Sequence, residues 1–279
     1  MNNRNIEHEV KEWMEQVWGR AANDWIQRDQ DLNYREYAVH PTVEEQVMQL
    51  ETVKNGIYID AGCGDGDETI FLRNLLEKKD FSGTLYGFDK QANLIDEAKR
   101  KHDSGKNICT IFDAGSLIEL VEDSGIKGKA DLVHSAFVFQ EVPFIRDFIQ
   151  DIAQSLRQGG TLLGVFVHPQ FEDLMGELGN IRINDQLKHP EWDYCGEFPI
   201  VESGGSFYVP VFHRNLSRYV SLFEEHFYIN SLTGIQPHSS KVQDLEYRGI
   251  LPFCEHNQNV YYPYICEMPS SLLVTATRK

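Results

Sequence analysis

The segment DAGCGDG at residues 60–66 has the residue types and the spacing of a ligand-binding turn. Its three glycines stand at alternate positions directly after a short apolar run, so the backbone can turn tightly and approach a ligand without a Cβ in the way. A helix is expected to follow, and its N-terminus would add free amide groups. Asp65 and Asp67 would oppose a pyrophosphate, so the pattern favours a ligand that carries an ammonium or sulfonium and no phosphate.

Two further carboxylates follow the next predicted strands. Asp89 ends a strand 23 residues after Gly66, where an acidic side chain can accept hydrogen bonds from both hydroxyls of a ribose. Asp113 follows the strand after that and could accept a hydrogen bond from an exocyclic amine. Open α/β sheets bind ligands beyond the carboxyl ends of their strands, so these groups are expected to share one crevice. Structural interpretations stay open, because Asp60 could cap its turn and Asp113 could form an Asx turn.

Short apolar runs alternate with amphipathic stretches, a pattern typical of a mostly parallel sheet covered by helices on both faces. The predicted strands span residues 57–61, 84–89, 108–112, 130–136, 161–167, 227–232 and 271–277. The predicted helices between them span residues 67–78, 91–101, 117–121, 144–156 and 215–225. The sequence therefore predicts an α/β fold with a Rossmann-like, seven-stranded, mostly parallel sheet.

The chain divides into four predicted parts. Residues 1–50 are expected to form a helical N-terminal cover, and residues 51–169 the ligand-binding core. Residues 170–212 hold many aromatic side chains among Gly and Pro with no clean period, so we interpret them as an insertion cap after strand five. These aromatic side chains could line a binding site or form the insertion's own core. Residues 213–279 would complete the core sheet.

Composition excludes several classes of function. The 279 residues carry a formal net charge of −17 at pH 7, which repels polyanions and argues against nucleic acid or an anionic membrane as a partner. The five cysteines show no C-x-x-C pair, and no H-E-x-x-H or similar pattern indicates a metal site. The N-terminus lacks the apolar segment of a signal peptide, and no run reaches the ~18 apolar residues of a membrane span. We therefore expect a cytoplasmic protein.

Five motifs in register resemble those of class I S-adenosylmethionine-dependent methyltransferases. They are DAGCGDG at 60–66, GFD at 87–89, FDA at 112–114, ADLV at 130–133 and LRQGG at 156–160. The tail resembles a small-molecule branch of that superfamily, with PVFHRNL at 210–216 and a closing LLV at 272–274. The resemblance implies S-adenosyl-L-methionine as cofactor and S-adenosyl-L-homocysteine as product.

The resemblance also implies which residues hold the methionine part of the cofactor. The backbone of Gly62 and Gly64 would lie against it, and Asp60 would lie near its ammonium. Ser135 and Ala136, just after strand four, would line the sulfonium end.

The same resemblance assigns the nucleoside part to the next two strands. Asp89 would hold the ribose hydroxyls, and Lys90 would lie beside the adenine. Asp113 would accept a hydrogen bond from the adenine amine, and the Ala114 amide would reach a ring nitrogen. Tyr37 belongs to the segment that covers the cofactor in relatives, and it could contact the cofactor from there.

The expected reaction is methyl transfer to an oxygen, nitrogen or carbon of a small organic acceptor, and the aromatic cap favours one with a ring. Two alternatives stay open: a methyltransferase acting on protein or RNA, and a non-catalytic relative that keeps the cofactor pocket. His213 and His168 are the candidates for a general base, although either could simply pack. We interpret Glu141 as a helix-start residue and His134 as a core histidine. The sequence gives no prediction of the acceptor's identity or of the oligomeric state.

Overall fold

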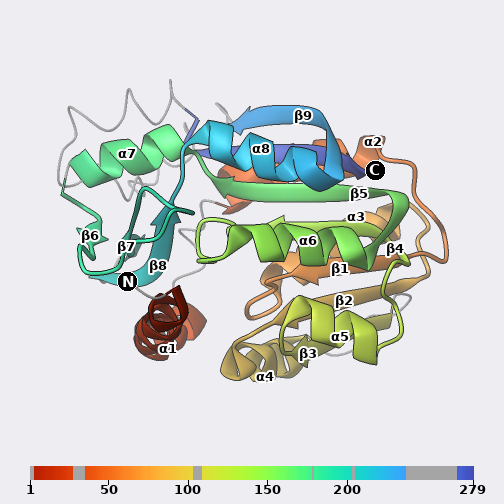
Figure 1. Ribbon diagram of the computed structural model, residues 1–279. Helices are drawn as coiled ribbons and strands as arrows, with labels where there is room; N and C mark the ends of the chain where they lie inside the picture. Colours follow the sequence, from red (N-terminus) through yellow and green to blue (C-terminus); the bar gives the residue numbers. More distant parts are fainter. Residues whose placement is uncertain (1–2, 28–34, 103–108, 178, 203–204, 237–268) are drawn as a thin grey trace, which may run out of the picture.

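Seven strands form one sheet in the order β3-β2-β1-β4-β5-β10-β9 (Figure 1). The structure, a computed structural model, describes residues 3–27, 35–102, 109–177, 179–202, 205–236 and 269–279. The parallel strands are β1 (Ile57–Ala61), β2 (Thr84–Asp89), β3 (Cys109–Ala114), β4 (Ala130–Ala136) and β5 (Leu156–Val167). β10 (Ser271–Arg278) runs antiparallel between β5 and β9 (Phe227–Ile235). The predicted Rossmann-like, seven-stranded fold is confirmed.

Helices cover both faces of this sheet. On one face lie α5 (Leu117–Asp123), α6 (Ile145–Ser155) and α8 (Leu216–His226). On the other lie α2 (His40–Gln49), α3 (Asp67–Lys78) and α4 (Ala92–Lys101). Within β1, Ile59 packs into the first core and its neighbour Tyr58 into the second, because successive side chains of a strand point to opposite faces.

The boundary between α6 and β5 differs from the prediction. The helix ends at Ser155 and the strand begins at Leu156, earlier than the expected start at residue 161. Leu156 pairs with Ala130 ahead of an irregularity in the register, and Gly159 takes a φ of 71° within it. The glycine pair therefore lies in an irregular early part of the strand and does not separate it from the helix.

The predicted insertion contains a small sheet that the sequence pattern does not reveal. After α7 (Pro169–Glu177) come β6 (Arg182–Ile183), β7 (Tyr194–Glu202) and β8 (Gly205–His213), which pair antiparallel in that order. Val209 packs toward the N-terminal helix and Val211 toward α7. Because the hairpin buries apolar side chains on both faces, the alternation that marks a half-exposed strand is absent.

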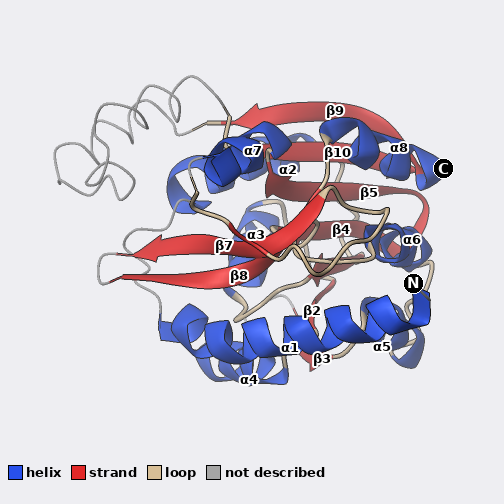
Figure 2. Cartoon of the chain, turned by 60° about the vertical axis from the view of Figure 1, so that its left-hand side comes forward, coloured by secondary structure: helices blue, strands red, loops and turns tan. Residues whose placement is uncertain are grey.

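The N-terminal cover begins with one long helix, α1 (Asn3–Gln27), which is followed by a short π-helix, η2 (Arg35–Val39), ahead of α2. α1 packs along β8: Val10 joins Phe212, and Ala21 joins Phe207. Figures 1 and 2 show α1 and the small sheet together on the side where β5 runs into α7, which is the carboxyl edge of the parallel strands. Among the described residues, no helix combines the length and the apolar content that crossing a membrane requires.

Candidate functional site

The glycine turn after β1 has a backbone that only glycine adopts readily. Gly62, Gly64 and Gly66 take φ angles of 80°, 55° and 86°. The amides of Gly62 and Cys63 both donate to the carbonyl of Phe88, at 2.7 and 3.0 Å, so the turn is fastened to the end of β2. A Cβ on Gly64 would meet one atom within 4 Å, Nε1 of Trp25 at 3.7 Å. The turn thus presents a bare backbone at the carboxyl edge of the sheet.

Asp89 ends β2 and joins this turn directly. One carboxylate oxygen accepts from the Gly64 amide at 2.9 Å, and the other accepts from the Gln91 amide at 2.8 Å. Burial, together with the nearby carboxylates of Asp60 and Asp65, raises the pKa of Asp89, although the two amides act in the opposite direction. A cation bound beside Asp89 would relieve this repulsion, whereas an anion would increase it.

Asp60 lies in the buried floor of the turn. Its carboxylate accepts from the Thr69 hydroxyl at 2.7 Å and lies 3.3 Å from Nδ1 of His134 on β4. Burial lowers the pKa of His134, but the carboxylates of Asp60 and Glu68 outweigh it and the net shift is upward. His134 is fully buried, as expected of a core histidine, but its Nε2 has no hydrogen-bond partner among the described residues, so the ring is satisfied only at Nδ1.

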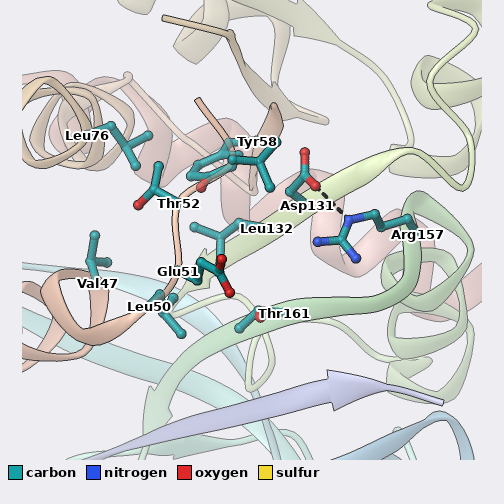
Figure 3. Close-up of a pocket in the computed structure, with 11 residues that line it drawn as sticks. Val47, Leu50, Glu51, Thr52, Tyr58, Leu76, Asp131, Leu132, Arg157 and Thr161 are labelled. Atoms are coloured by element: carbon teal, nitrogen blue, oxygen red, sulfur yellow. Dashed lines mark hydrogen bonds and ion pairs between the residues drawn. The ribbon is translucent and has the colours of Figure 1, made fainter. Parts of the chain in front are cut away.

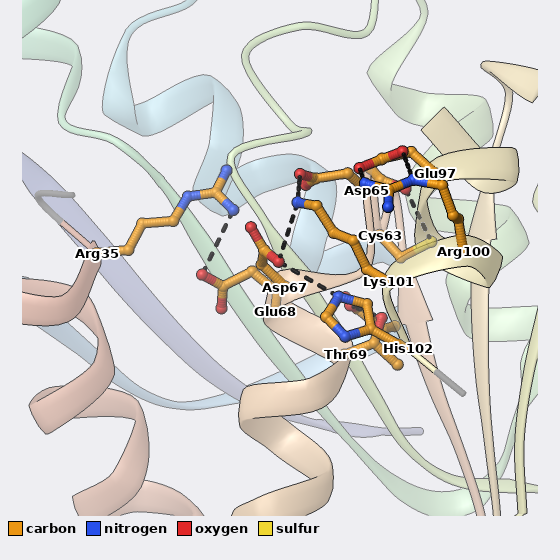
Figure 4. Close-up of polar contacts among 12 residues, drawn as sticks. Arg35, Cys63, Asp65, Asp67, Glu68, Thr69, Glu97, Arg100, Lys101 and His102 are labelled. Carbon is orange, nitrogen blue, oxygen red and sulfur yellow. Dashed lines mark hydrogen bonds and ion pairs between the residues drawn. The ribbon is translucent and has the colours of Figure 1, made fainter. Parts of the chain in front are cut away.

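A second buried carboxylate, Glu68 in the first turn of α3, fastens the N-terminal cover to the core. It lies 2.9 Å from Nε2 of His40 and 3.4 Å from Nη1 of Arg35. Burial raises the pKa of Glu68, but the hydrogen bond from His40 and the charge of Arg35 outweigh it and bring the pKa to about 2. Glu68 is therefore ionised at neutral pH and anchors the start of η2 (Figure 4).

Asp65 and Asp67, the acidic neighbours of the turn, are paired with side chains at the C-terminal end of α4. The Lys101 ammonium lies 2.5 Å from Asp65 and 3.4 Å from Asp67, and His102 lies 3.3 Å from Asp67 (Figure 4). The indole of Trp25 also donates to Asp65, at 3.4 Å. These contacts indicate that both carboxylates are structural groups at the start of α3, where the helix dipole also favours them.

Strand pairing brings the predicted adenine residues beside Asp89. β2 and β3 pair Phe88 with Asp113 and Asp89 with Ala114. The Asp113 side chain is exposed, and its carboxylate accepts from the Ala114 amide at 2.9 Å. Lys90 is exposed at the same edge. The three predicted residues therefore share the carboxyl edge, but the Ala114 amide is already hydrogen-bonded to its neighbour's side chain.

The structure says less about two other predicted cofactor residues, Ser135 and Tyr37. Ser135 is fully buried in β4, and its hydroxyl donates to the carbonyl of Ala61 at 2.8 Å, so it fastens β4 to β1. Tyr37 belongs to η2, but its side chain lies outside the described residues.

The two histidines predicted as general bases are both engaged elsewhere. His213, at the end of β8, has Nδ1 2.8 Å from Glu172 and Nε2 3.1 Å from Asp173. Its ring also stacks on Tyr194 with centroids 4.6 Å apart. His168 is 8% exposed, and its Nδ1 accepts from the Gln170 amide at 3.1 Å. His213 ties the cap to α7 through two carboxylates, and such pairing suits a structural ion pair better than a free base.

Sequence reasoning underestimated a carboxyl group on the turn after β4. α6 begins at Ile145, so Glu141 does not start that helix and instead lies in the turn that precedes it. The side chain is partly buried, and burial raises the pKa of Glu141 well above its ordinary value. The one available signal was an acidic residue within the otherwise uncharged stretch AFVFQEVPF at 136–144.

A small cavity lies at the opposite edge of the sheet (Figure 3). It holds about 40 Å³ and is lined by residues including Tyr58, Asp131 and Arg157. Asp131 accepts from the Ile57 amide at 3.0 Å and from Nε of Arg157 at 2.6 Å, so its carboxylate has a structural role at the start of β1 and β4. This volume accommodates a few water molecules at most, so the cavity is not the cofactor site.

Within the described part of the chain, no group of three or more His, Cys, Asp or Glu could hold a metal ion.

Comparison with known proteins places a methyltransferase domain on this core. Residues 59–162 match the family model described as a methyltransferase domain. Ribosomal RNA small subunit methyltransferase H of Shewanella halifaxensis is 29% identical over 139 residues, covering 47% of this chain and 43% of that protein. The enzyme of the same name from Caldicellulosiruptor bescii is 35% identical over 86 residues, covering 30% and 27%. The chain thus spans less than half the length of these relatives.

Solved structures show the same fold at low identity. An S-adenosylmethionine dependent methyltransferase from Mesorhizobium loti has a TM-score of 0.52 and 16% identity, covering 85% of this chain and 96% of that one. A chain from the complex between the Haloferax volcanii Trm112 methyltransferase activator and a methyltransferase has a TM-score of 0.59 and 15% identity, covering 95% of this chain and 96% of that one. The fold and the glycine turn agree with those of class I S-adenosylmethionine-dependent methyltransferases, and residues 59–162 match a methyltransferase domain. S-adenosylmethionine is the cofactor of this class.

Proposed function

We propose that this protein transfers a methyl group from S-adenosylmethionine to a small organic acceptor. The observation that carries the proposal is the hydrogen bond from the Gly64 amide to the Asp89 carboxylate. Through it, a carboxylate at the end of β2 holds the bare backbone of the glycine turn after β1. Carboxylates of Asp60, Asp65 and Asp89 act on one another there. That electrostatic setting suits a phosphate-free nucleoside with a positive charge, which S-adenosylmethionine is, and disfavours a dinucleotide.

We assign the cofactor to the residues of this edge. Gly62 and Gly64 would lie along its methionine part over the floor made by Asp60. Asp89 would accept from the ribose hydroxyls, because each of its oxygens holds one amide and has a further lone pair to offer.

The adenine would lie toward β3, where Lys90, Asp113 and Ala114 share the edge. Ser135 supports this crevice from β4, and Tyr37 belongs to the segment that enters it from the N-terminal cover. These assignments follow the resemblance and the position of each residue at the carboxyl edge.

The cofactor supplies an activated methyl group, so the protein's main task is alignment. Holding an acceptor in near-attack geometry contributes about 7–11 kcal/mol to lowering a barrier. α1 and the β7–β8 hairpin pack together over the carboxyl edge through Trp18, Trp25 and Phe207. Such a cover would exclude water and enclose an acceptor of limited size.

RNA is the second candidate acceptor, because the curated relatives named above are ribosomal RNA methyltransferases. Three features favour the small acceptor. The net charge of −17 opposes a polyanion, and the match to the Shewanella halifaxensis enzyme covers only 47% of this chain and 43% of that protein. A cap packed on α1 also favours an enclosed site.

Calorimetry with S-adenosylhomocysteine tests the cofactor site. We expect binding, and we expect Asp89→Asn to weaken it by about 1–3 kcal/mol, because one charged acceptor is lost while the shape is kept. Asp123→Asn, at an exposed position in α5, is the matched control and should bind as the unaltered protein does. Equal affinity in both variants would remove the ribose assignment.

The acceptor class is tested with radiolabelled methyl donor and cell extract separated by size. Label in the low-molecular-mass fraction supports a small acceptor. Label in RNA or in protein contradicts it and selects the corresponding alternative.

A further inference from the structure

The turn after β4, residues 137–142, is held in one conformation by a buried arginine. Arg214 is 1% exposed, and its guanidinium donates to the carbonyls of Phe139 at 3.4 Å and of Val142 at 2.7 Å. It also donates to the carbonyl of Pro143 at 2.7 Å. These carbonyls stand on both sides of Glu141, so the backbone that carries this residue is held in place by Arg214, which directly follows β8.

The same turn is joined to the sheet and to the cap. The side-chain amide of Gln140 donates to the Phe137 carbonyl at 2.6 Å, and its backbone carbonyl accepts from the Phe212 amide at 2.7 Å. The Phe137 amide donates to Val165 of β5 at 2.7 Å. A group carried on this turn is therefore positioned by rigid elements, as acid–base catalysis requires.

The turn also borders the cofactor crevice. A Cβ on Gly62 would lie 2.2 Å from Cγ2 of Val138, so the turn and the glycine backbone are in direct contact. The Arg35 guanidinium lies over the Phe137 ring at 5.1 Å from its centroid. The turn thus lies between the glycine backbone and the N-terminal cover.

Glu141 is the ionisable residue of this turn, and it faces charged groups from two other elements. The charges of Arg35 of η2 and Asp89 of β2 both act on its carboxylate. Asp89 ends the strand on the far side of β1, so the end of β2 and the turn that carries Glu141 lie on either side of the glycine turn. Burial and the negative charge of Asp89 raise its pKa, against the effects of Arg35 and Gln140. A raised pKa makes a carboxylate a stronger base, which suits a group that accepts a proton during a reaction.

We propose that Glu141 is the catalytic base of the methyl transfer and that the acceptor is an amine that enters as its ammonium ion. This inference rests on the proposed methyltransferase function. The carboxylates of Asp89 and Glu141 act on each other, and the Arg35 guanidinium that also acts on Glu141 is paired with Glu68 at 3.4 Å, which favours a cationic acceptor over an anionic one.

In this reaction the acceptor nitrogen first gives one proton to the Glu141 carboxylate and thereby frees its lone pair. The nitrogen then forms a bond to the methyl carbon. The carbon–sulfur bond breaks with its electron pair left on sulfur, and Glu141 passes its proton to water. Charge and atoms balance without any further reactant.

Two cofactor analogues test the position of Glu141 without knowledge of the acceptor. Sinefungin carries an ammonium-bearing carbon where S-adenosylhomocysteine has a neutral sulfur, so it places a positive charge at the point of methyl transfer. Calorimetry of both ligands from pH 6 to pH 9 gives the ratio of their affinities. We expect this ratio to favour sinefungin by about tenfold or more once Glu141 is ionised, because an opposite charge nearby shifts a pKa by at least about one unit.

The variants Glu141→Gln and Glu224→Gln separate the role of this carboxylate from a general loss of negative charge. Glu224 is exposed on α8, so its variant should keep the sinefungin preference. Glu141→Gln should bind S-adenosylhomocysteine normally and lose the preference. In two buffers of different ionisation enthalpy, sinefungin should release a proton from the unaltered protein below the pKa of Glu141, and none from Glu141→Gln.

Each outcome decides between the two proposals. If neither analogue binds the unaltered protein, the proposed function fails. If both bind but Glu141→Gln keeps the sinefungin preference, or itself loses S-adenosylhomocysteine, the inference about Glu141 is overturned while the cofactor site stands.

The labelled product reports on the acceptor class. A methylated amine should pass into organic solvent only at alkaline pH. A product that releases labelled methanol in alkali is an ester and would overturn the assignment of an amine.

Discussion

A methyl group added at Gly62 gives the sharpest test of the glycine turn. Gly62→Ala would place a Cβ 2.2 Å from Cγ2 of Val138 at a φ of 80°. The left-handed backbone costs a non-glycine residue about 1–2 kcal/mol. Overpacking adds about 1–3 kcal/mol. We therefore expect the free energy of unfolding to fall by about 2–5 kcal/mol.

The structure also supplies the means to separate these two costs. Gly125 has a φ of 66° and would meet nothing within 4 Å, so Gly125→Ala should show the backbone cost alone. In the double variant Gly62→Ala/Val138→Ala the overlap is removed, and the two changes should be less harmful together than their sum by about 1–3 kcal/mol.

Urea unfolding of these variants measures each of those terms. Contact between the glycine turn and the turn after β4 is the claim under test. Strictly additive losses of unfolding free energy for Gly62→Ala and Val138→Ala, or equal losses for Gly62→Ala and Gly125→Ala, would refute it. S-adenosylhomocysteine affinity, measured in parallel, should fall for Gly62→Ala and stay unchanged for Gly125→Ala.

The remaining predictions concern the charges around the turn. Glu68 has its pKa lowered from 4.5 to about 2, so its stabilising contribution is present above pH 4.5 and is lost as the pH falls toward 2. Glu68→Gln should therefore lose less stability than the unaltered protein between pH 5 and pH 3 in thermal unfolding, and parallel curves would contradict this. Lys101→Met should lower the free energy of unfolding by about 1–3 kcal/mol, because Asp65, 2% exposed, loses its cation. Adding Asp65→Asn should restore part of that loss, and a double variant that is no better would show that the pair contributes nothing.

Much of the core could be predicted from sequence because its signals are local. The strands carry continuous apolar runs, and the glycines of residues 62–66 allow a φ that other residues avoid. Asp89 and Asp113 could be assigned to one edge because parallel strands all end there. The pairing of Phe88 with Asp113 and of Asp89 with Ala114 matches that expectation.

The cap and the chemistry at its border depended on contacts that are distant in sequence. The β7–β8 hairpin is covered on both faces, so its residues show no alternation to identify them. His213 looks like a free base in the sequence, yet Glu172, which is 41 residues away, lies 2.8 Å from its ring. Glu141 looks like a helix start in the sequence. In the structure it lies in a turn whose carbonyls are held by Arg214, which is 73 residues away and follows β8.

The sequence by itself determined the fold class and the glycine turn, because both depend on backbone conformations and periodicities that neighbouring residues impose. The cofactor type followed from the resemblance of its motifs to those of class I S-adenosylmethionine-dependent methyltransferases. The tertiary structure decided which ionisable side chains are engaged and which border the crevice. A pKa depends on burial and on charges that other elements bring within a few ångströms, and that information is absent from local sequence.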